Sequence, residues 1–115
     1  KFADAGTPGQ AKLITYAQMQ KVVKTPGIVI VDARSHETWS KKHIGKAINI
    51  FPYDEEEAVM NKVMDLPRDK TIVIYCDGGE CDSSHKLADI MLNFGYKKVF
   101  IYAGGWEEWS KKEQR

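Results

Sequence analysis

Two unbroken apolar runs, rich in β-branched residues, constrain the fold of this chain more than any other feature. The first run is Ile28 to Val31, which ends at Asp32, and the second is Thr71 to Tyr75, which ends at Cys76. Runs of this kind are typical of strands in a parallel sheet, because such strands are buried on both faces. The sequence therefore predicts two interior strands, each followed at once by a polar or reactive side chain.

Helical patterns alternate with these runs. Thr15 and Gln18 form a capping-box pattern that opens a helix, and Pro26 ends it. Further helices are predicted over 35–42, over 55–64, from the cysteines to Gly95 and after Gly104, and further strands over 47–50 and 98–102. Such alternation predicts an α/β domain with a small, mainly parallel sheet flanked by helices.

The length and charge of the chain narrow its class. With 115 residues, the chain is long enough for one compact domain and too short for two. Residues 1–11 are rich in Gly, Ala and Pro and predict a flexible lead-in to a domain over residues 12–115. A formal net charge of +1 favours neither a nucleic-acid partner nor an anionic membrane, and no apolar run is long enough to span a bilayer. We expect a monomer.

The compartment stays open at this point. The chain begins with Lys1 and not with Met, so the sequence is compatible with an upstream signal or anchor that has been removed. Two cysteines are too few for the disulfide-dense pattern of a small secreted scaffold. The cytoplasm and an extracytoplasmic space such as the periplasm are both consistent with the sequence.

The stretch IVIYCDGGECDSSHKLADIM, residues 72–91, holds both cysteines of the chain. Functional sites of parallel α/β sheets collect at the carboxyl ends of strands, where the next helix points its N–H groups. We expect such groups to lower the pKa of a thiol at Cys76. Gly78 and Gly79 suit a loop that curls around one sulfur atom. The alternative is that Cys76 packs as a small apolar side chain.

Three separated segments resemble the rhodanese family of sulfurtransferases. VDARSHETWSKKHIGKAINI, residues 31–50, resembles the first signature of that family, which is carried here by Asp32, Arg34, Glu37, Trp39, His43, Ile44, Ala47, Asn49 and Ile50. IVIYCDGGECDSS resembles its active-site loop, and GYKKVFIYAGGWEEW, residues 95–109, resembles its closing strand and Gly-Gly-x-x-x-Trp signature. The similarity covers roughly residues 12–110.

The resemblance implies a rhodanese-like fold and a chemistry. Cys76 would be the nucleophile that takes a sulfane sulfur from a donor, holds it as a persulfide and gives it to an acceptor. The donor would be a small molecule or a protein-borne sulfur and the acceptor a thiol, and neither a cofactor nor a metal is expected. Structural roles fall to the remaining motif residues, which are Asp32, Arg34, Glu37, His43, Gly104, Gly105, Trp106 and Trp109.

The loop departs from the family pattern in its length and its charge. It is about two residues longer than in a common single-domain rhodanese, and it consists of Asp77, Gly78, Gly79, Glu80, Cys81, Asp82 and Ser83. Three carboxylates near the thiol oppose its ionisation and repel a dianion, so we expect thiosulfate to be a poor donor. Related folds with longer loops act on phosphate through an arginine about six residues after the cysteine, but position 82 is Asp, which argues against a phosphatase.

Cys81 leaves more than one function open. It could be a resolving thiol that forms a disulfide with Cys76, or a buried cysteine at a helix start. Together with His85 the two cysteines offer three of the four ligands of a zinc site, and no second pair is present. The alternatives to a sulfurtransferase are therefore a thiol redox or persulfide relay that uses a Cys76–Cys81 disulfide, and a noncatalytic binding or regulatory domain.

Overall fold

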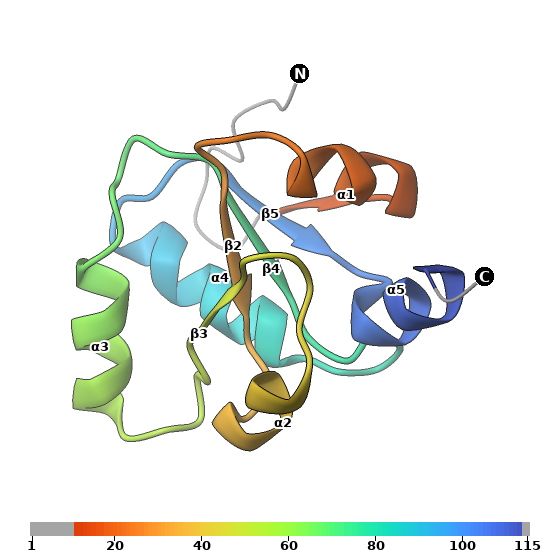
Figure 1. Cartoon of the computed structure of the whole chain (residues 1–115). Coiled ribbons are helices and arrows are strands. Elements are labelled where there is room, and N and C mark those ends of the chain that lie inside the picture. Colours follow the sequence, from red (N-terminus) through yellow and green to blue (C-terminus); the bar gives the residue numbers. More distant parts are fainter. Residues whose placement is uncertain (1–10, 114–115) are drawn as a thin grey trace.

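The computed structural model describes residues 11–113 and shows strands alternating with helices (Figure 1). The strands are β1 (Lys12–Ile14), β2 (Val29–Asp32), β3 (Ile48–Asn49), β4 (Ile72–Tyr75) and β5 (Val99–Tyr102). The helices are α1 (Tyr16–Val23), α2 (His36–Lys41), α3 (Glu56–Met64), α4 (Ser83–Asn93) and α5 (Gly105–Glu113). Of the predicted lead-in, residues 1–10 lie outside the described residues, and Ala11 packs half-buried against the core.

The strands form one sheet in the order β1-β5-β4-β2-β3, and every pair in it is parallel. The predicted α/β architecture is therefore confirmed. β2 and β4, the two runs that dominate the sequence, lie side by side, with Asp32 opposite Tyr75. Because carboxyl ends of parallel strands share one edge, Asp32 and Cys76 reach the same end of the sheet.

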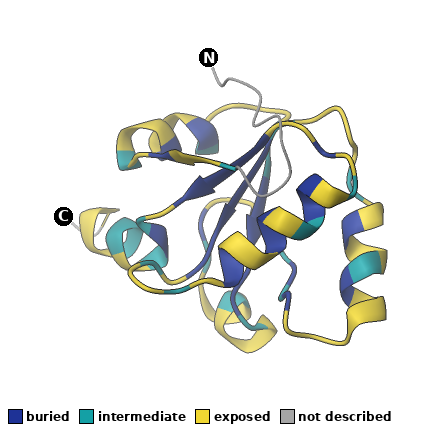
Figure 2. Cartoon of the chain, turned by 180° about the vertical axis from the view of Figure 1, so that it is seen from behind, coloured by how far each residue is buried: buried dark blue, intermediate teal, exposed yellow. Residues whose placement is uncertain are grey.

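Alternate residues of the interior strands enter two separate cores. Ile72 and Ile74 of β4 face the core that contains residues of α3 and α4, whereas Val73 and Tyr75 face the core that packs against α1 and α5. This division follows from the two-residue period of a strand. Figure 2 shows the buried residues of α4 turned toward the sheet, whereas α2 has none. Cys76 belongs to the core beneath α4.

Local signals explain most element ends. The capping box of α1 is present, since Thr15 Oγ1 accepts from Gln18 N at 3.2 Å and Gln18 Oε1 accepts from Thr15 N at 2.8 Å. Gly95 follows α4 with φ of 97°, a left-handed conformation that glycine tolerates. β1 was not predicted, because a segment of three residues with only Ile14 buried is too short to give a recognisable strand pattern. Within residues 11–113, every helix is too short or too polar to cross a membrane.

Candidate functional site

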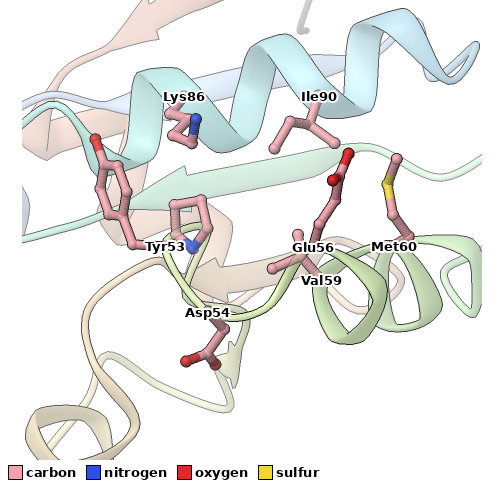
Figure 3. Close-up of a pocket in the computed structure, with 8 residues that line it drawn as sticks. Tyr53, Asp54, Glu56, Val59, Met60, Lys86 and Ile90 are labelled. Atoms are coloured by element: carbon pink, nitrogen blue, oxygen red, sulfur yellow. The ribbon is translucent and has the colours of Figure 1, made fainter.

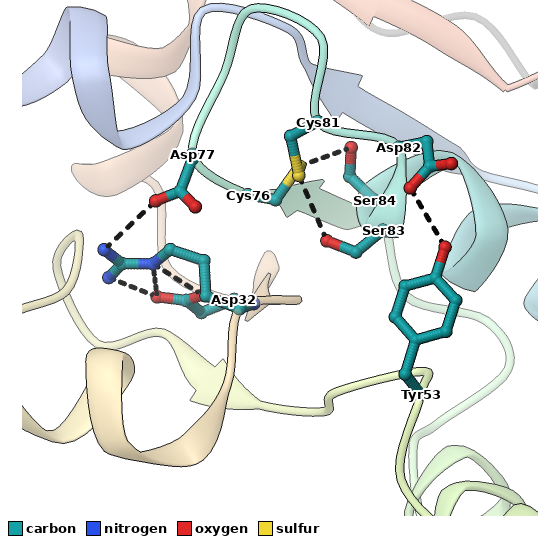
Figure 4. The surroundings of a disulfide bond; sticks show 9 residues. Asp32, Tyr53, Cys76, Asp77, Cys81, Asp82, Ser83 and Ser84 are labelled. Carbon is teal, nitrogen blue, oxygen red and sulfur yellow. Dashed lines mark hydrogen bonds and ion pairs between the residues drawn. A yellow bond between two sulfur atoms is a disulfide. The ribbon is translucent and has the colours of Figure 1, made fainter.

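Cys76 follows β4 directly and opens the loop that leads to α4. It is buried, with 3% of its surface exposed, and it forms a disulfide with Cys81, whose Cα lies 6.5 Å away (Figure 4). Cys81 is only half-buried. The two cysteines, five residues apart in the sequence, are therefore close enough to form a disulfide, which a resolving role for Cys81 requires. A catalytic role for either cysteine remains a prediction.

The amino end of α5 holds the backbone of the cysteine loop. Trp106 N donates to Cys76 O at 2.8 Å, and Glu107 N donates to Asp77 O at 2.9 Å. The first N–H groups of a helix have no partner within the helix, so here they hold the loop carbonyls in place. The Gly-Gly-Trp segment thereby fixes the position of Cys76.

Two glycines allow this close contact. Gly78 has φ of 104° and a side chain there would overlap the carbonyl oxygen of Gly104. Gly105 has φ of 63°, and a Cβ on it would lie 2.5 Å from Cys76 O and 2.6 Å from Gly78 N. Because each obstacle is backbone, neither can rotate away. The glycines of the two motifs are thus needed for loop and helix to pack together.

Two serines of the first turn of α4 contact the sulfur atoms. Ser84 Oγ lies 3.3 Å from Cys76 Sγ, and Ser83 Oγ lies 3.3 Å from Cys81 Sγ. The sulfur atoms of a disulfide carry no proton, so the hydroxyl groups are the donors in this state. Both serines are buried. Each sulfur atom therefore has its own hydroxyl group next to it.

A buried ion pair lies on the other side of β4. Asp32 accepts from Arg34 Nη2 at 2.7 Å, from Arg34 N at 2.8 Å and from the Tyr75 hydroxyl at 2.6 Å. The Tyr75 hydroxyl in turn accepts from Ile44 N at 2.9 Å. Burial, followed by the Asp32 carboxylate, raises the pKa of Tyr75 well above its usual range. This network joins the end of β2 to the segment before β3.

Arg34 connects the three sequence motifs. Its Nη2 donates to Lys42 O at 2.6 Å, and its Nη1 lies 3.9 Å from a carboxylate oxygen of Asp77 in the cysteine loop. Its guanidinium also lies 5.0 Å from the ring centre of Trp106. Burial lowers the pKa of Arg34, but the hydrogen bond and charge of Asp32 outweigh it and the pKa is raised. Arg34 is therefore a fixed cation beneath the loop.

An open cavity of about 460 Å³ lies over the disulfide. Its lining includes Cys81 but not Cys76, and consists of Arg34, Ser35, Thr38, Phe51, Tyr53, Asp77, Glu80, Cys81, Asp82 and Ser83. Three carboxylates face one guanidinium that is already paired with Asp32. The excess charge of the cavity is negative.

Tyr53 lines both this cavity and a second one. Its hydroxyl donates to Asp82 Oδ1 at 2.9 Å, and Lys86 Nζ lies 5.4 Å from its ring centre. The second cavity, of about 510 Å³, lies between α3 and α4 (Figure 3). It adds apolar side chains, among them Met60 and Ile90, next to the cavity over the disulfide.

The remaining predicted residues lie farther from the sulfur atoms. Glu37 is exposed on α2, and His43 Nδ1 donates to Trp39 O while its ring stacks on the Trp39 ring. Trp109 packs edge-on against Tyr16 and Tyr102 between α5 and α1. The structural roles of Glu37, His43 and Trp109 remain predictions.

The start of α4 differs in detail from the usual capping arrangement. Asp82 occupies the N-cap position, but its side chain makes no capping hydrogen bond and accepts from Tyr53 instead. His85 is exposed. Within the described part of the chain, no three His, Cys, Asp or Glu side chains are grouped so that they could hold a metal ion.

Sequence reasoning missed Tyr75 and Tyr53. In the sequence, Tyr75 looked like an ordinary strand residue. A tyrosine at the end of the strand paired with the strand that ends in Asp32 could have indicated a hydrogen bond to that carboxylate. Tyr53 meets Asp82 across 29 residues of sequence, and no local pattern marks that contact.

Comparisons with known proteins agree with this geometry. A model of the rhodanese-like domain family matches residues 15–112. The thiosulfate sulfurtransferase GlpE of Coxiella burnetii is 29% identical over 98 residues, which cover 85% of this chain and 86% of that protein. A tRNA uridine(34) hydroxylase of Pectobacterium carotovorum is 32% identical over 99 residues. That match covers 83% of this chain but only 27% of the hydroxylase.

A solved structure has the same fold. The BH2092 protein of Bacillus halodurans superposes with a TM-score of 0.79 at 28% identity, over 90% of this chain and 74% of that one. The family match spans nearly all of the described residues, including β2, the cysteine loop and α5. The chain therefore belongs to the rhodanese-like domain family.

Proposed function

We propose that this domain is a sulfurtransferase that carries a sulfane sulfur as a persulfide on Cys76 and passes it to a thiol or another nucleophilic acceptor. The observation that carries the proposal is the place of Cys76. It lies at the carboxyl end of a central strand, before the amino end of α4, in a loop that two α5 hydrogen bonds hold. A thiolate at such a helix start is stabilised by the helix dipole.

The reaction needs the reduced loop. The Cys76 thiolate attacks the outer sulfur of the donor, an S–S bond forms at Cys76, and the remainder of the donor leaves with the electron pair of the broken bond. An acceptor thiolate then attacks that outer sulfur, and Cys76 leaves as a thiolate. The Ser84 hydroxyl, 3.3 Å from Cys76 Sγ, stabilises the thiolate both before it attacks the donor and after it leaves the transferred sulfur.

The cavity supports a thiol-borne donor over thiosulfate. Asp77, Glu80 and Asp82 line the approach to the loop, and the single guanidinium there, that of Arg34, is paired with Asp32. A dianion entering this cavity is repelled, whereas a hydropersulfide carries less charge at the reacting end. We expect a persulfide donor to be used with a higher kcat/KM than thiosulfate.

A second candidate is a persulfide relay that cycles through the Cys76–Cys81 disulfide. The observation that favours it is the disulfide itself. In this relay Cys81 attacks Cys76 Sγ of the persulfide, the outer sulfur leaves as hydrosulfide, and a thiol must then reduce the loop. The persulfide carrier and the relay differ in whether Cys81 is needed for turnover.

Mass spectrometry of reduced, desalted protein separates these functions. The sulfurtransferase gains one sulfur on Cys76 from glutathione persulfide and returns it to cyanide as thiocyanate, and Cys76→Ser abolishes both steps. Cys81→Ser still turns over as a persulfide carrier, but a relay would stall as a stable persulfide on Cys76. If Cys76→Ser kept full transfer activity, the assignment of Cys76 as the sulfur carrier would be wrong. If the protein gained no sulfur from glutathione persulfide or from thiosulfate, the noncatalytic binding domain would be favoured instead.

A further inference from the structure

The two sulfur atoms of the disulfide differ in how a reactant reaches them. Cys81 lines the open cavity of about 460 Å³, while Cys76 is absent from that lining and is 3% exposed. A nucleophile that enters through the cavity therefore meets Cys81 Sγ. Access decides which sulfur of a disulfide is attacked. Cys81 is thus the electrophilic end of the bridge.

Cys76 is well placed to act as the leaving group. When Cys81 Sγ is attacked, the electron pair of the S–S bond moves to Cys76 Sγ. That atom lies 3.3 Å from the hydroxyl of Ser84, a residue of the first turn of an 11-residue helix, and Ser84 is 3% exposed. A buried hydroxyl and the positive end of the helix dipole both stabilise a thiolate there.

We propose that the oxidised loop itself accepts a sulfane sulfur from a hydropersulfide and stores it as a trisulfide between Cys76 and Cys81. The proposal rests on the proposed sulfurtransferase function and adds a second way of loading the same site. It makes Cys81 a catalytic residue for that route, because Cys81 Sγ bonds to the transferred atom.

The steps balance without any external oxidant or reductant. The terminal sulfur of the donor anion RSS⁻ attacks Cys81 Sγ, and the Cys76 thiolate leaves. Cys76 then attacks the same transferred sulfur, the bond between that sulfur and R–S breaks, and RS⁻ leaves with the electron pair. The net change converts one disulfide and one hydropersulfide anion into one trisulfide and one thiolate. Attack by an acceptor thiolate on the central sulfur, with closure of the disulfide, reverses the sequence.

The loop offers room for the longer bridge. The Cα atoms of the two cysteines are 6.5 Å apart, near the upper end of the range for a disulfide. Cys76 is held by Trp106 N, but Cys81 is half-buried beside the cavity. Gly79 and Glu80, which precede Cys81, are exposed. The added atom can therefore be taken up on the cavity side by movement of exposed residues.

Intact-mass measurement of the oxidised full chain tests the proposal. Protein whose thiols are fully oxidised is incubated with glutathione persulfide, treated with iodoacetamide and analysed without reduction. We expect a gain of one sulfur atom without hydrogen, no alkylation, and release of one glutathione thiol per sulfur loaded. Fragmentation should place the added atom between Cys76 and Cys81. Reduced wild type and Cys81→Ser run in parallel, and each should give an alkylatable persulfide on Cys76.

Three results would overturn the proposal. If the oxidised protein gains nothing while the reduced protein gains a sulfur on Cys76, the trisulfide route fails and the sulfurtransferase function stands. An added sulfur that iodoacetamide caps would mean that the bridge had opened to a thiol and a persulfide. If neither form gains sulfur, both this route and the proposed function fail.

The two serines provide a matched test of direction. Ser84→Ala removes the donor beside the leaving Cys76 and should slow loading of the oxidised form by about tenfold, the value of a charge-assisted hydrogen bond of ~1.4 kcal/mol. Ser83→Ala removes the donor beside Cys81 and should slow it clearly less. With glutathione in place of the persulfide, the trapped mixed disulfide should lie on Cys81. A larger effect at Ser83, or trapping on Cys76, would reverse the assigned polarity.

Discussion

The contact between the cysteine loop and α5 gives the sharpest prediction about stability. Alanine at Gly78 has two costs: a φ of 104° that side chains rarely adopt, and overlap with the Gly104 carbonyl. Alanine at Gly79 has only the first, since φ is 60° and the nearest atom would be Glu107 Oε1 at 3.9 Å. The two neighbouring glycines therefore form a matched pair in one loop.

The expected magnitudes follow from these contacts. Gly79→Ala should cost about 1 kcal/mol for a left-handed backbone. Gly78→Ala should cost about 2 kcal/mol in backbone strain and, because the loop must move off α5, about 1 kcal/mol for each of the two hydrogen bonds from Trp106 N and Glu107 N. The difference of about 3 kcal/mol corresponds to a Tm difference of about 12 °C in a domain of this size.

Urea unfolding of the reduced variants measures this difference, because reduction removes the disulfide from the comparison. Gly105→Ala is the test from the other side of the contact, since its Cβ would lie 2.6 Å from Gly78 N. The double variant of Gly78→Ala and Gly105→Ala should lose less unfolding free energy than the sum of the two single variants, because both substitutions break the same contact. Equal losses at Gly78 and Gly79, within about 0.5 kcal/mol, would refute the reasoning.

Three further perturbations test the ion pair, the buried phenol and the charge of the cavity. Asp32→Ala leaves the buried Arg34 charge without its main partner and should cost about 4 kcal/mol in urea unfolding, whereas Glu107→Ala, which breaks an exposed pair with Lys111, should cost under about 0.5 kcal/mol. Because the pKa of Tyr75 is raised in the folded state, the protonated phenol contributes its full stabilisation below pH about 10 and loses it as the pH rises further. Tyr75 should therefore add about 1.4 kcal/mol per pH unit to the alkaline fall in the free energy of unfolding, and this fall should be shallower in Tyr75→Phe. An unchanged slope would contradict that assignment. Glu80→Lys at the cavity should raise kcat/KM for thiosulfate about fivefold, from ~1 kcal/mol of screened attraction, while Glu57→Lys on α3 should not.

The sequence was sufficient for the elements whose signals are local. The β-branched runs predict β2 and β4 because a strand buried on both faces needs apolar residues at every position. Thr15 and Gln18 predict the start of α1 because the capping box lies within four residues. The position of Cys76 directly after such a run predicts that it lies at the carboxyl end of a central strand.

The rest depends on contacts between distant segments. β1 forms because Lys12 to Ile14 pair with Phe100 to Tyr102, more than 80 residues away, and only Ile14 is buried. The disulfide depends on the path of the loop, which α5 fixes from beyond β5. The three motifs could be aligned in sequence, but only the fold shows that Arg34 touches all of them.

The dependence of the cysteine loop on α5 has a consequence for synthesis. Every strand of the sheet precedes Gly105, so a nascent chain can complete its sheet before the residues that hold Cys76 O and Asp77 O have left the ribosome. Until then both carbonyls lack their helix donors, and the loop between Cys76 and Cys81 is not yet positioned. The loop that contains Cys76 can therefore be positioned only once the start of α5 has emerged, after most residues of the hydrophobic core have been synthesised.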